Sequence, residues 1–234
     1  MWKLVAAPDR GDLLFPRSHC PACGAHIRRR HLLPLISYAM LRGRCADCGA
    51  AISIRYPLVE FSGALSALIA LYLFGVTFTA AFAFSFFLFV ITLGVIDHET
   101  GYLPDVLTLP LLGLGLFANG LGLFSTSVAS AAIGAIIGYG AFRLVEIAFR
   151  RLRGVDGLGQ GDAKLLAALG AWFGWAVLPP IVFLAAIFAL AGAGAAVLRG
   201  GKIDVQTPTA FGPALAGAGA LAMIAQGLRL PFFF

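Results

Sequence analysis

Seven long apolar runs constrain this chain more than any other feature of its sequence. They lie at about 58–75, 77–96, 106–124, 128–149, 163–178, 179–198 and 209–228. Each approaches the roughly 20 residues that a helix needs to cross a bilayer core. Of the 234 residues, 60% are hydrophobic and 12% are charged, whereas about a quarter of a soluble domain is charged. The sequence therefore predicts an all-α polytopic membrane protein with about seven transmembrane helices.

The loops between the runs predict how the chain is oriented. Nine of the 17 Lys and Arg residues precede residue 57, and the loops at 150–162 and 199–208 are also basic. The loops near residues 76, 126 and 179 contain neither Lys nor Arg. Basic loops stay in the cytoplasm, so the N-terminus is expected there, and Arg229 is the one exception. The net charge of +6 therefore reflects orientation, not nucleic-acid binding.

Composition changes sharply near residue 57 and predicts two domains. Residues 1–57 form a polar, basic head that contains all four cysteines, and 58–234 form the membrane domain. Within the membrane domain, Pro179-Pro180 predicts a turn between two spans.

The four cysteines of the head predict a metal site. Cys20 and Cys23 form one Cys-x-x-Cys-Gly motif, and Cys45 and Cys48 form a second. Such turns direct two thiolates at one ion, so the four residues are expected to hold a structural zinc. Redox thiols or another thiophilic metal are the alternatives, and a disulfide is disfavoured in a reducing cytoplasm. His19 and His26 are read as bystanders, because four cysteines already complete a tetrahedral site.

Two aspartates at the ends of apolar runs are the candidate catalytic groups. Asp97 ends the second run and Asp162 precedes the fifth, in Gly159-Gln160-Gly161-Asp162. The predicted topology puts both on the cytoplasmic face, where two coupled carboxylates can share one proton and activate water, as in aspartic proteases. The simpler interpretation of Asp162 alone is a helix N-cap.

The other acidic residues have simpler explanations. Asp105 is expected to cap the following helix. Glu60 is expected to pair with Arg55 or to remain at the interface, and Glu146 is expected in an ion pair with Arg143 or Arg150. Glu99 and Asp156 are expected to be solvated.

Several motifs in order resemble the type IV prepilin leader peptidases, which are membrane aspartic peptidases of pilus and type II secretion systems. The motifs are Ser18-His19-Cys20-Pro21-Ala22-Cys23, Leu35-Ile36-Ser37-Tyr38, Leu41-Arg42-Gly43-Arg44-Cys45, Arg55-Tyr56-Pro57-Leu58-Val59-Glu60, Ile96-Asp97, Leu103-Pro104-Asp105, Gly161-Asp162-Ala163-Lys164-Leu165-Leu166-Ala167-Ala168-Leu169-Gly170-Ala171-Trp172 and Phe211-Gly212-Pro213. Together they span most of residues 18–215.

The resemblance implies a function and a location. It makes Asp97 and Asp162 the catalytic pair of an enzyme in the bacterial inner membrane. The substrate would be a prepilin or pseudopilin, cut after a glycine at the cytoplasmic face. An acidic rim of Glu99, Asp105 and Asp156 would suit the basic leader of that substrate.

The resemblance also concerns a second activity. Many members methylate the new N-terminus with S-adenosylmethionine, and the cysteine head goes with those longer forms. This chain departs from them in two places, which leaves methylation open. Only 19 residues precede Cys20, without the extra membrane span, and Leu32-Leu33-Pro34 stands where Asn-Ile-Pro is usual.

Three other functions compete with this interpretation. An ion- or proton-coupled transporter would need charged groups deep in its spans, and 107–142 and 165–198 contain no acidic or basic residue. A non-catalytic, zinc-headed scaffold of a secretion machine would not need the aspartate pair. A protease of the presenilin kind is disfavoured by the cysteine head and by Leu103-Pro104-Asp105.

Overall fold

The computed structural model describes residues 19–28, 31, 33, 35–153, 159–198 and 211–230. The chain forms two compact units that divide between Ala64 and Leu65. Its helices are α1 (Ile36–Met40), α2 (Arg55–Phe74), α3 (Phe78–Thr100), α4 (Asp105–Gly120), α5 (Val128–Arg153), α6 (Gln160–Phe173), α7 (Leu178–Leu198) and α8 (Gly212–Gly227), with a 3-10 turn, η2 (Trp175–Val177), before α7. Each predicted apolar run thus corresponds to a helix.

Four helical stretches are long and apolar enough to span a membrane. They are Arg55–Phe74, Phe78–Thr100, Val128–Leu152 and Trp175–Leu198. The other helices of the larger unit are shorter, with 16 residues in α4, 14 in α6 and 16 in α8. A helix of 14 residues reaches only about 21 Å, less than the ~30 Å of a bilayer core. The described residues therefore establish four candidate spans, and the predicted count of seven is not confirmed.

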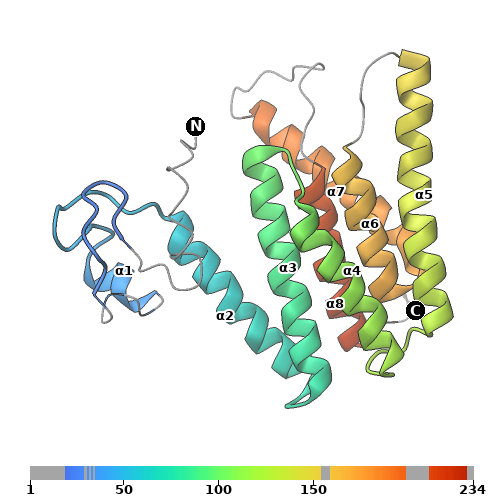
Figure 1. Ribbon diagram of the computed structural model, residues 1–234, viewed down its shortest axis with the longest axis horizontal. Coiled ribbons are helices and arrows are strands. Elements are labelled where there is room, and N and C mark those ends of the chain that lie inside the picture. The colour runs from blue at the N-terminus through green and yellow to red at the C-terminus, as the bar shows by residue number, and fades with distance from the viewer. Residues whose placement is uncertain are drawn as a thin grey trace. The chain divides into compact units, whose positions relative to one another are not determined.

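The short helix α6 forms the centre of the larger unit. Eleven of its residues are buried, including Leu165, Leu169 and Trp172, and it packs against α4, α5 and α8. Figure 1 shows α6 between α4 and α5. A helix enclosed by its neighbours does not need to face lipid along its whole length.

Glycines bring the backbones of α5 and α6 into direct contact. A Cβ at Gly134 would lie 2.5 Å from the Gly170 carbonyl oxygen, and one at Gly138 would lie 2.7 Å from that of Leu166. A Cβ at Gly170 would in turn overlap the Gly134 carbonyl. Such close approach of small residues is how membrane helices associate. The register of α6 against α5 is therefore fixed by backbone contact.

A buried amide satisfies the C-terminal end of α6. The last carbonyls of a helix have no partner within it. The Asn119 side chain donates to the carbonyls of Ala171 and Trp172, at 2.9 and 3.1 Å. The Trp172 indole donates to the Leu111 carbonyl at 2.8 Å. These bonds attach α6 to α4.

The turn predicted at Pro179-Pro180 lies earlier in the chain. The helix α6 ends before Gly174, which has a φ of 80°, and α7 begins at Leu178. The two prolines occupy the first turn of α7, where a missing N–H costs nothing. The prediction placed the turn at the prolines, whereas the left-handed glycine makes it.

Successive helices of the larger unit alternate in direction. Figure 1 shows α3, α5 and α7 running one way and α4, α6 and α8 the other. The end of α3 and the starts of α4, α6 and α8 therefore meet at one end of the unit, and both candidate aspartates lie at that end.

Candidate active site and metal centre

The two candidate catalytic aspartates are both buried. Asp97 lies in the last turn of α3 and is 4% exposed, and Asp162 lies in the first turn of α6 and is 7% exposed. They are close enough for their charges to interact. Burial of a carboxylate is costly unless it is paired or used, so two neighbouring buried carboxylates indicate a functional site.

The surroundings of Asp97 come from the end of α3 and the start of α8. Gly101, left-handed with a φ of 65°, ends α3 by donating its N–H to the Asp97 carbonyl. The Asp97 carboxylate receives the backbone N–H of Gly212 at the start of α8. A Cβ at Gly212 would lie 2.5 Å from Asp97 Oδ2. Only glycine therefore fits against this carboxylate.

One oxygen of Asp97 is available for further hydrogen bonding. Among the described residues, Oδ2 is buried and has no hydrogen-bond partner. A buried polar atom of this kind requires an explanation. A water or a substrate carbonyl at this position would satisfy it.

Asp162 is not the N-cap that the simpler interpretation suggested. The N-cap of α6 is Gly159, and the Asp162 carboxylate reaches back to accept the Gly159 backbone N–H. The carboxylate occupies the place of the acidic partner in a capping box, so it stabilises the helix start without capping it. Its role in the helix and its place beside Asp97 are compatible.

The loop between α3 and α4 and the first residue of α4 each hold the first turn of α6. Leu103 is buried against Gly161, where a Cβ would lie 2.8 Å from the leucine Cβ. Asp105 forms an ion pair with Lys164 at 2.5 Å. Asp105 is not the expected cap, because α4 has Pro104 at its N-cap. The contacts fall on either side of Asp162.

The remaining acidic residues have mixed outcomes. Glu146 pairs with Arg143 at 2.6 Å, as predicted. Glu60 accepts the Leu35 backbone N–H at 2.9 Å. Asp156 lies outside the described residues, so the predicted acidic rim remains a prediction.

The cysteines of the head lie in two matching turns. In the first, the N–H of Gly24 donates to the Cys20 carbonyl at 2.8 Å, and in the second Gly49 donates to Cys45 at 3.0 Å. Gly24 and Gly49 have φ values of 71° and 72°, which only glycine adopts readily. Each turn therefore presents its two thiols in the same way.

The four thiols fit one metal ion. The Sγ atoms of Cys20, Cys23, Cys45 and Cys48 lie within 4.8 Å of one another, and those of Cys20 and Cys48 are 3.9 Å apart. Tetrahedral zinc with bonds of about 2.3 Å sets its sulfurs ~3.8 Å apart. His19 and His26 lie outside this cluster and join the two arms of the first turn through a backbone bridge.

The thiols compete for negative charge. Backbone hydrogen bonds from Ala22 and Cys23 lower the pKa of Cys20 to about 7. For Cys48, the backbone bond from Ala50 lowers the pKa, but the Cys23 thiol, burial and the other thiols outweigh it and raise the pKa to about 12. A divalent ion would relieve this competition by binding all four as thiolates.

Comparison with known proteins supports the same assignment. Residues 82–194 match the type IV leader peptidase family, and residues 3–74 match the bacterial peptidase A24 N-terminal domain. A protein of Burkholderia pseudomallei (strain 1026b) is 46% identical over 213 residues, which cover 91% of this chain and 68% of the relative. The chain belongs to the type IV leader peptidase family. The resemblance seen in the sequence motifs is thereby confirmed.

Several relatives of this leader peptidase family member carry the same name. The Burkholderia protein is called prepilin leader peptidase/N-methyltransferase. Proteins with the same name from Dickeya chrysanthemi and Neisseria gonorrhoeae are 44% and 42% identical. They match 92% and 89% of this chain and 75% and 71% of their own lengths. No solved structure matches the chain.

Two features of this leader peptidase site were not foreseen from the sequence. Gly212 belongs to a motif that carried the family resemblance, but only its packing against Asp97 gives it a role. Lys164 was part of another motif, and its partner Asp105 is 59 residues away in the chain. Neither contact leaves a periodic signal in the sequence.

Proposed function

We propose that the protein is a membrane-embedded aspartic endopeptidase. It removes the basic leader from type IV prepilins or type II secretion pseudopilins at the cytoplasmic face of the bacterial inner membrane, and it methylates the new N-terminus. The observation that carries the peptidase assignment is the pair of buried, interacting carboxylates of Asp97 and Asp162. Family membership and the shared name of the relatives support the substrate class.

The proposed cleavage uses the two aspartates in complementary protonation states. One ionised carboxylate takes a proton from water, and the resulting hydroxyl oxygen bonds to the scissile carbonyl carbon. The other, protonated carboxylate gives its proton to the carbonyl oxygen. When the intermediate collapses, the C–N bond breaks and the leaving amine takes a proton from the carboxylate that accepted one. As the carbonyl re-forms, a hydroxyl of the intermediate returns a proton to the other carboxylate. The pair therefore returns to its starting charge.

The residues around the two aspartates hold the carboxylates in place and do not themselves react. The N–H group of Gly159 holds the Asp162 carboxylate, and that of Gly212 holds the Asp97 carboxylate. The unpartnered Oδ2 of Asp97 is the atom that we assign to the water or the scissile carbonyl. A preorganised pair of this kind avoids reorganisation during the reaction.

The proposed topology keeps the site at the cytoplasmic face. The head, assigned to 1–57, is cytoplasmic, and 58–234 form the peptidase domain. All seven helices from α2 to α8 lie in the membrane layer, where α4, α5 and α8 enclose α6. The basic residues that precede residue 57 support this orientation.

The head has a structural role in this proposal. Zinc held by Cys20, Cys23, Cys45 and Cys48 joins the two turns, which have little apolar core of their own. Small domains of this size usually need such a ligand. Cleavage by Asp97 and Asp162 does not require the zinc ion, because carboxylates alone perform the hydrolysis.

Processing of a purified prepilin tests the proposal directly. The protein in detergent micelles is incubated with a prepilin and S-adenosylmethionine, and the product is analysed by intact mass spectrometry. The expected product lacks the leader and carries one methyl group on its N-terminal amine. A prepilin that stays intact contradicts the peptidase assignment, and a shortened product without the methyl group contradicts only the second activity.

A further inference from the structure

The connection between α3 and α4 is an extended segment that runs beside the two aspartates of the candidate site. It begins after Gly101, whose N–H donates to the Asp97 carbonyl at 2.8 Å. It ends at Pro104, whose backbone is extended with φ −71° and ψ 134°. Between them, Leu103 is buried against the glycine that precedes Asp162. Figure 1 shows this connection at the end of the larger unit where α6 and α8 begin.

Side chains alternate along this segment as they do along a strand. Tyr102 is 62% exposed, whereas Leu103 is 3% exposed. The Thr100 hydroxyl accepts the Tyr102 N–H at 3.2 Å, which fixes the start of the segment. An extended backbone whose side chains point alternately outward and inward is the geometry of a β-strand. The segment 102–104 therefore has the form of one short strand.

The backbone of Leu103 is unpaired. Within the part of the chain that the structure describes, no group accepts its N–H or donates to its carbonyl. Buried backbone groups are almost always hydrogen-bonded, so these free groups require an explanation, as the free Oδ2 of Asp97 does. Leu103 is as buried as the two carboxylates, which are 4% and 7% exposed. A substrate segment that reaches the carboxylates therefore also reaches the Leu103 backbone.

A carbonyl in the first turn of α4 also lacks its usual partner. Pro110 lies inside α4 and has no N–H, so the Val106 carbonyl has no donor four residues later in the helix. Val106 is 81% exposed on a surface that the proposed topology places in lipid, where unsatisfied backbone groups are costly. The start of α4 therefore adds an acceptor for an incoming chain close to the extended segment.

We propose that the segment 102–104 holds the cleavage region of the substrate as an added β-strand. The proposal rests on the peptidase part of the proposed function and names how the substrate is bound there. One N–H and one carbonyl of the substrate backbone pair with the carbonyl and N–H of Leu103, as between neighbouring strands. The exposed ring of Tyr102 packs on a substrate side chain beside the scissile bond, which makes Tyr102 a specificity-determining residue.

Strand addition explains how the end of an apolar substrate helix can be cut. The peptide groups inside a helix are bonded to one another, so the substrate must unwind where it enters the site. Unwinding frees backbone groups that need new partners once they leave water. Leu103 supplies such partners whatever the substrate side chains are, while contacts with alternate side chains give selectivity. The pairing also fixes which peptide bond lies against Asp97 and Asp162.

Peptides with a modified backbone test the pairing. They span the cleavage site, and each carries one N-methyl group near, but not at, the scissile amide. Loss of a paired N–H is expected to lower kcat/KM for cleavage by the full-length protein in detergent micelles by about tenfold or more. The sensitive positions alternate with insensitive ones, because successive N–H groups of a strand point to opposite sides. Equal loss at every position, or loss at none, overturns the pairing.

Photocrosslinking to an intact prepilin tests the same contact in the membrane. The crosslinking residue p-benzoylphenylalanine replaces Tyr102 in the Asp97→Asn variant, so that uncleaved substrate accumulates. Its crosslinks are expected on residues beside the scissile bond. Phe117 is the matched control, because it is 58% exposed and lies in the last turn of α4. The same replacement there is expected to give no crosslink beside the scissile bond.

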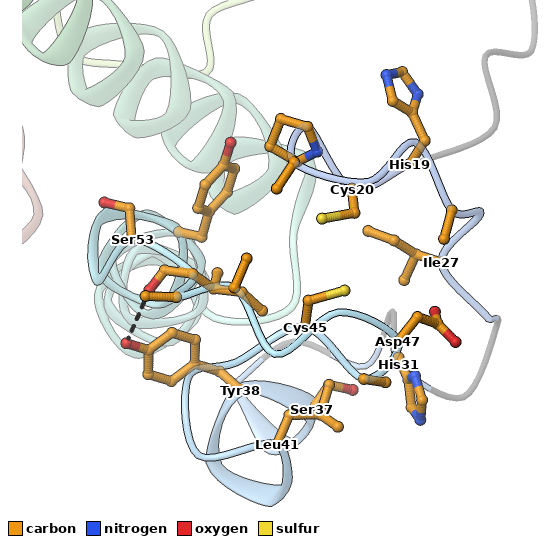
Figure 2. A pocket seen from close by; sticks show the side chains of 18 of the residues that line it. His19, Cys20, Ile27, His31, Ser37, Tyr38, Leu41, Cys45, Asp47 and Ser53 are labelled. Carbon is orange, nitrogen blue, oxygen red and sulfur yellow. Dashed lines mark hydrogen bonds between the residues drawn. The ribbon is translucent and has the colours of Figure 1, made fainter.

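Two variants of Tyr102 test the role of its side chain. Tyr102→Ala is expected to raise KM for the prepilin about fivefold with little change in kcat, because a binding contact is lost. Tyr102→Phe is expected to keep the wild-type KM, since the ring makes the contact. Zinc content shows that the head is folded in each variant, and Figure 2 shows Cys20 and Cys45 of its cluster close together. An unchanged KM for Tyr102→Ala overturns the specificity role.

The outcomes separate this proposal from the function on which it rests. Wild-type protein that leaves the prepilin intact overturns the peptidase assignment and the docking segment together. Normal cleavage of the prepilin, with no crosslink from position 102 beside the scissile bond, overturns the docking segment alone. If the short peptides are not cut, the crosslinks to the intact prepilin decide.

Discussion

At the scale of single residues, Gly212 has the closest relation to the proposed chemistry. Its N–H reaches the Asp97 carboxylate, and a Cβ would lie 2.5 Å from Oδ2. Gly212→Ala should lower the rate of leader removal by about tenfold or more, because moving a reacting group by ~1 Å has effects of that size. Prepilin cleavage by the purified variant measures it.

Gly217 provides the control for that change. It lies on the same helix, and a Cβ there would meet only Phe188, at an ordinary 3.6 Å. Gly217→Ala should therefore cleave at the normal rate. If the two alanine variants behave alike, the contact between Gly212 and Asp97 has no catalytic importance.

The ion pair between Lys164 and Asp105 is expected to act through position. Both side chains are partly exposed, and exposed pairs add at most about 1 kcal/mol of stability. Lys164→Met should lower kcat by about tenfold with little change in KM or in thermal stability, because the first turn of α6 loses one of its two holds. Steady-state cleavage of a prepilin separates these parameters.

A charge exchange sharpens this test. The double variant Asp105→Lys with Lys164→Asp should recover most of the lost rate, since the pair reforms in reverse. Arg28→Gln, which breaks an exposed ion pair in the head, should leave cleavage unchanged. A double variant that is no better than Lys164→Met would mean that the lysine acts in some other way.

The sequence was informative about the identity of the active residues and less so about their surroundings. Asp97 stands out because an acidic side chain at the end of an apolar run is costly. Asp162 was ambiguous, because the start of a helix tolerates acids for reasons of capping alone. The hydrogen bond from the Gly159 N–H to the Asp162 carboxylate depends on backbone geometry that no single residue type specifies.

At the scale of helices, the contact between α5 and α6 is the most constrained. Gly134→Ala should lower the free energy of unfolding by about 1–3 kcal/mol, the usual cost of forcing atoms into a packed interface. The expected result is a lower midpoint of thermal unfolding in detergent micelles. Gly140→Ala is the matched control on the same helix, because a Cβ there meets nothing within 4 Å. Equal midpoints for the two variants would contradict direct backbone packing.

If the two cysteine turns share one metal ion, each turn needs the other to bind it. Wild-type protein should contain about one zinc ion per chain, and Cys20→Ser or Cys45→Ser should each abolish it. Metal analysis of the purified protein measures this. His26→Ala should retain the zinc, since His26 lies outside the cluster. Retention of full metal content by both serine variants would exclude the four-cysteine site.

Apolar runs were enough to find every helix from α2 to α8, because a long run of this kind has few other structures open to it. Their ends were less predictable. The turn assigned to Pro179-Pro180 lies at Gly174, since proline fits a first helical turn as well as a loop. The length of α6 also could not be predicted, because its enclosure by α4, α5 and α8 depends on glycine contacts between distant segments.

At the scale of the whole molecule, the alternating helices explain why two aspartates 65 residues apart can meet. A site at one end of a membrane domain is reached by a substrate whose own apolar helix lies in the same bilayer. In this account the bilayer aligns the substrate, and the contacts around α6 align the catalytic groups.

Replacement of each aspartate by its amide tests the central claim most directly. Asp97→Asn and Asp162→Asn keep nearly the same shape but cannot exchange the proton that the mechanism requires. Each variant is expressed with a prepilin, and its insertion is checked by its abundance in the membrane fraction and by its zinc content. The account predicts that both variants insert normally and leave the leader uncleaved. Leader removal at the wild-type rate by either correctly inserted variant would contradict it.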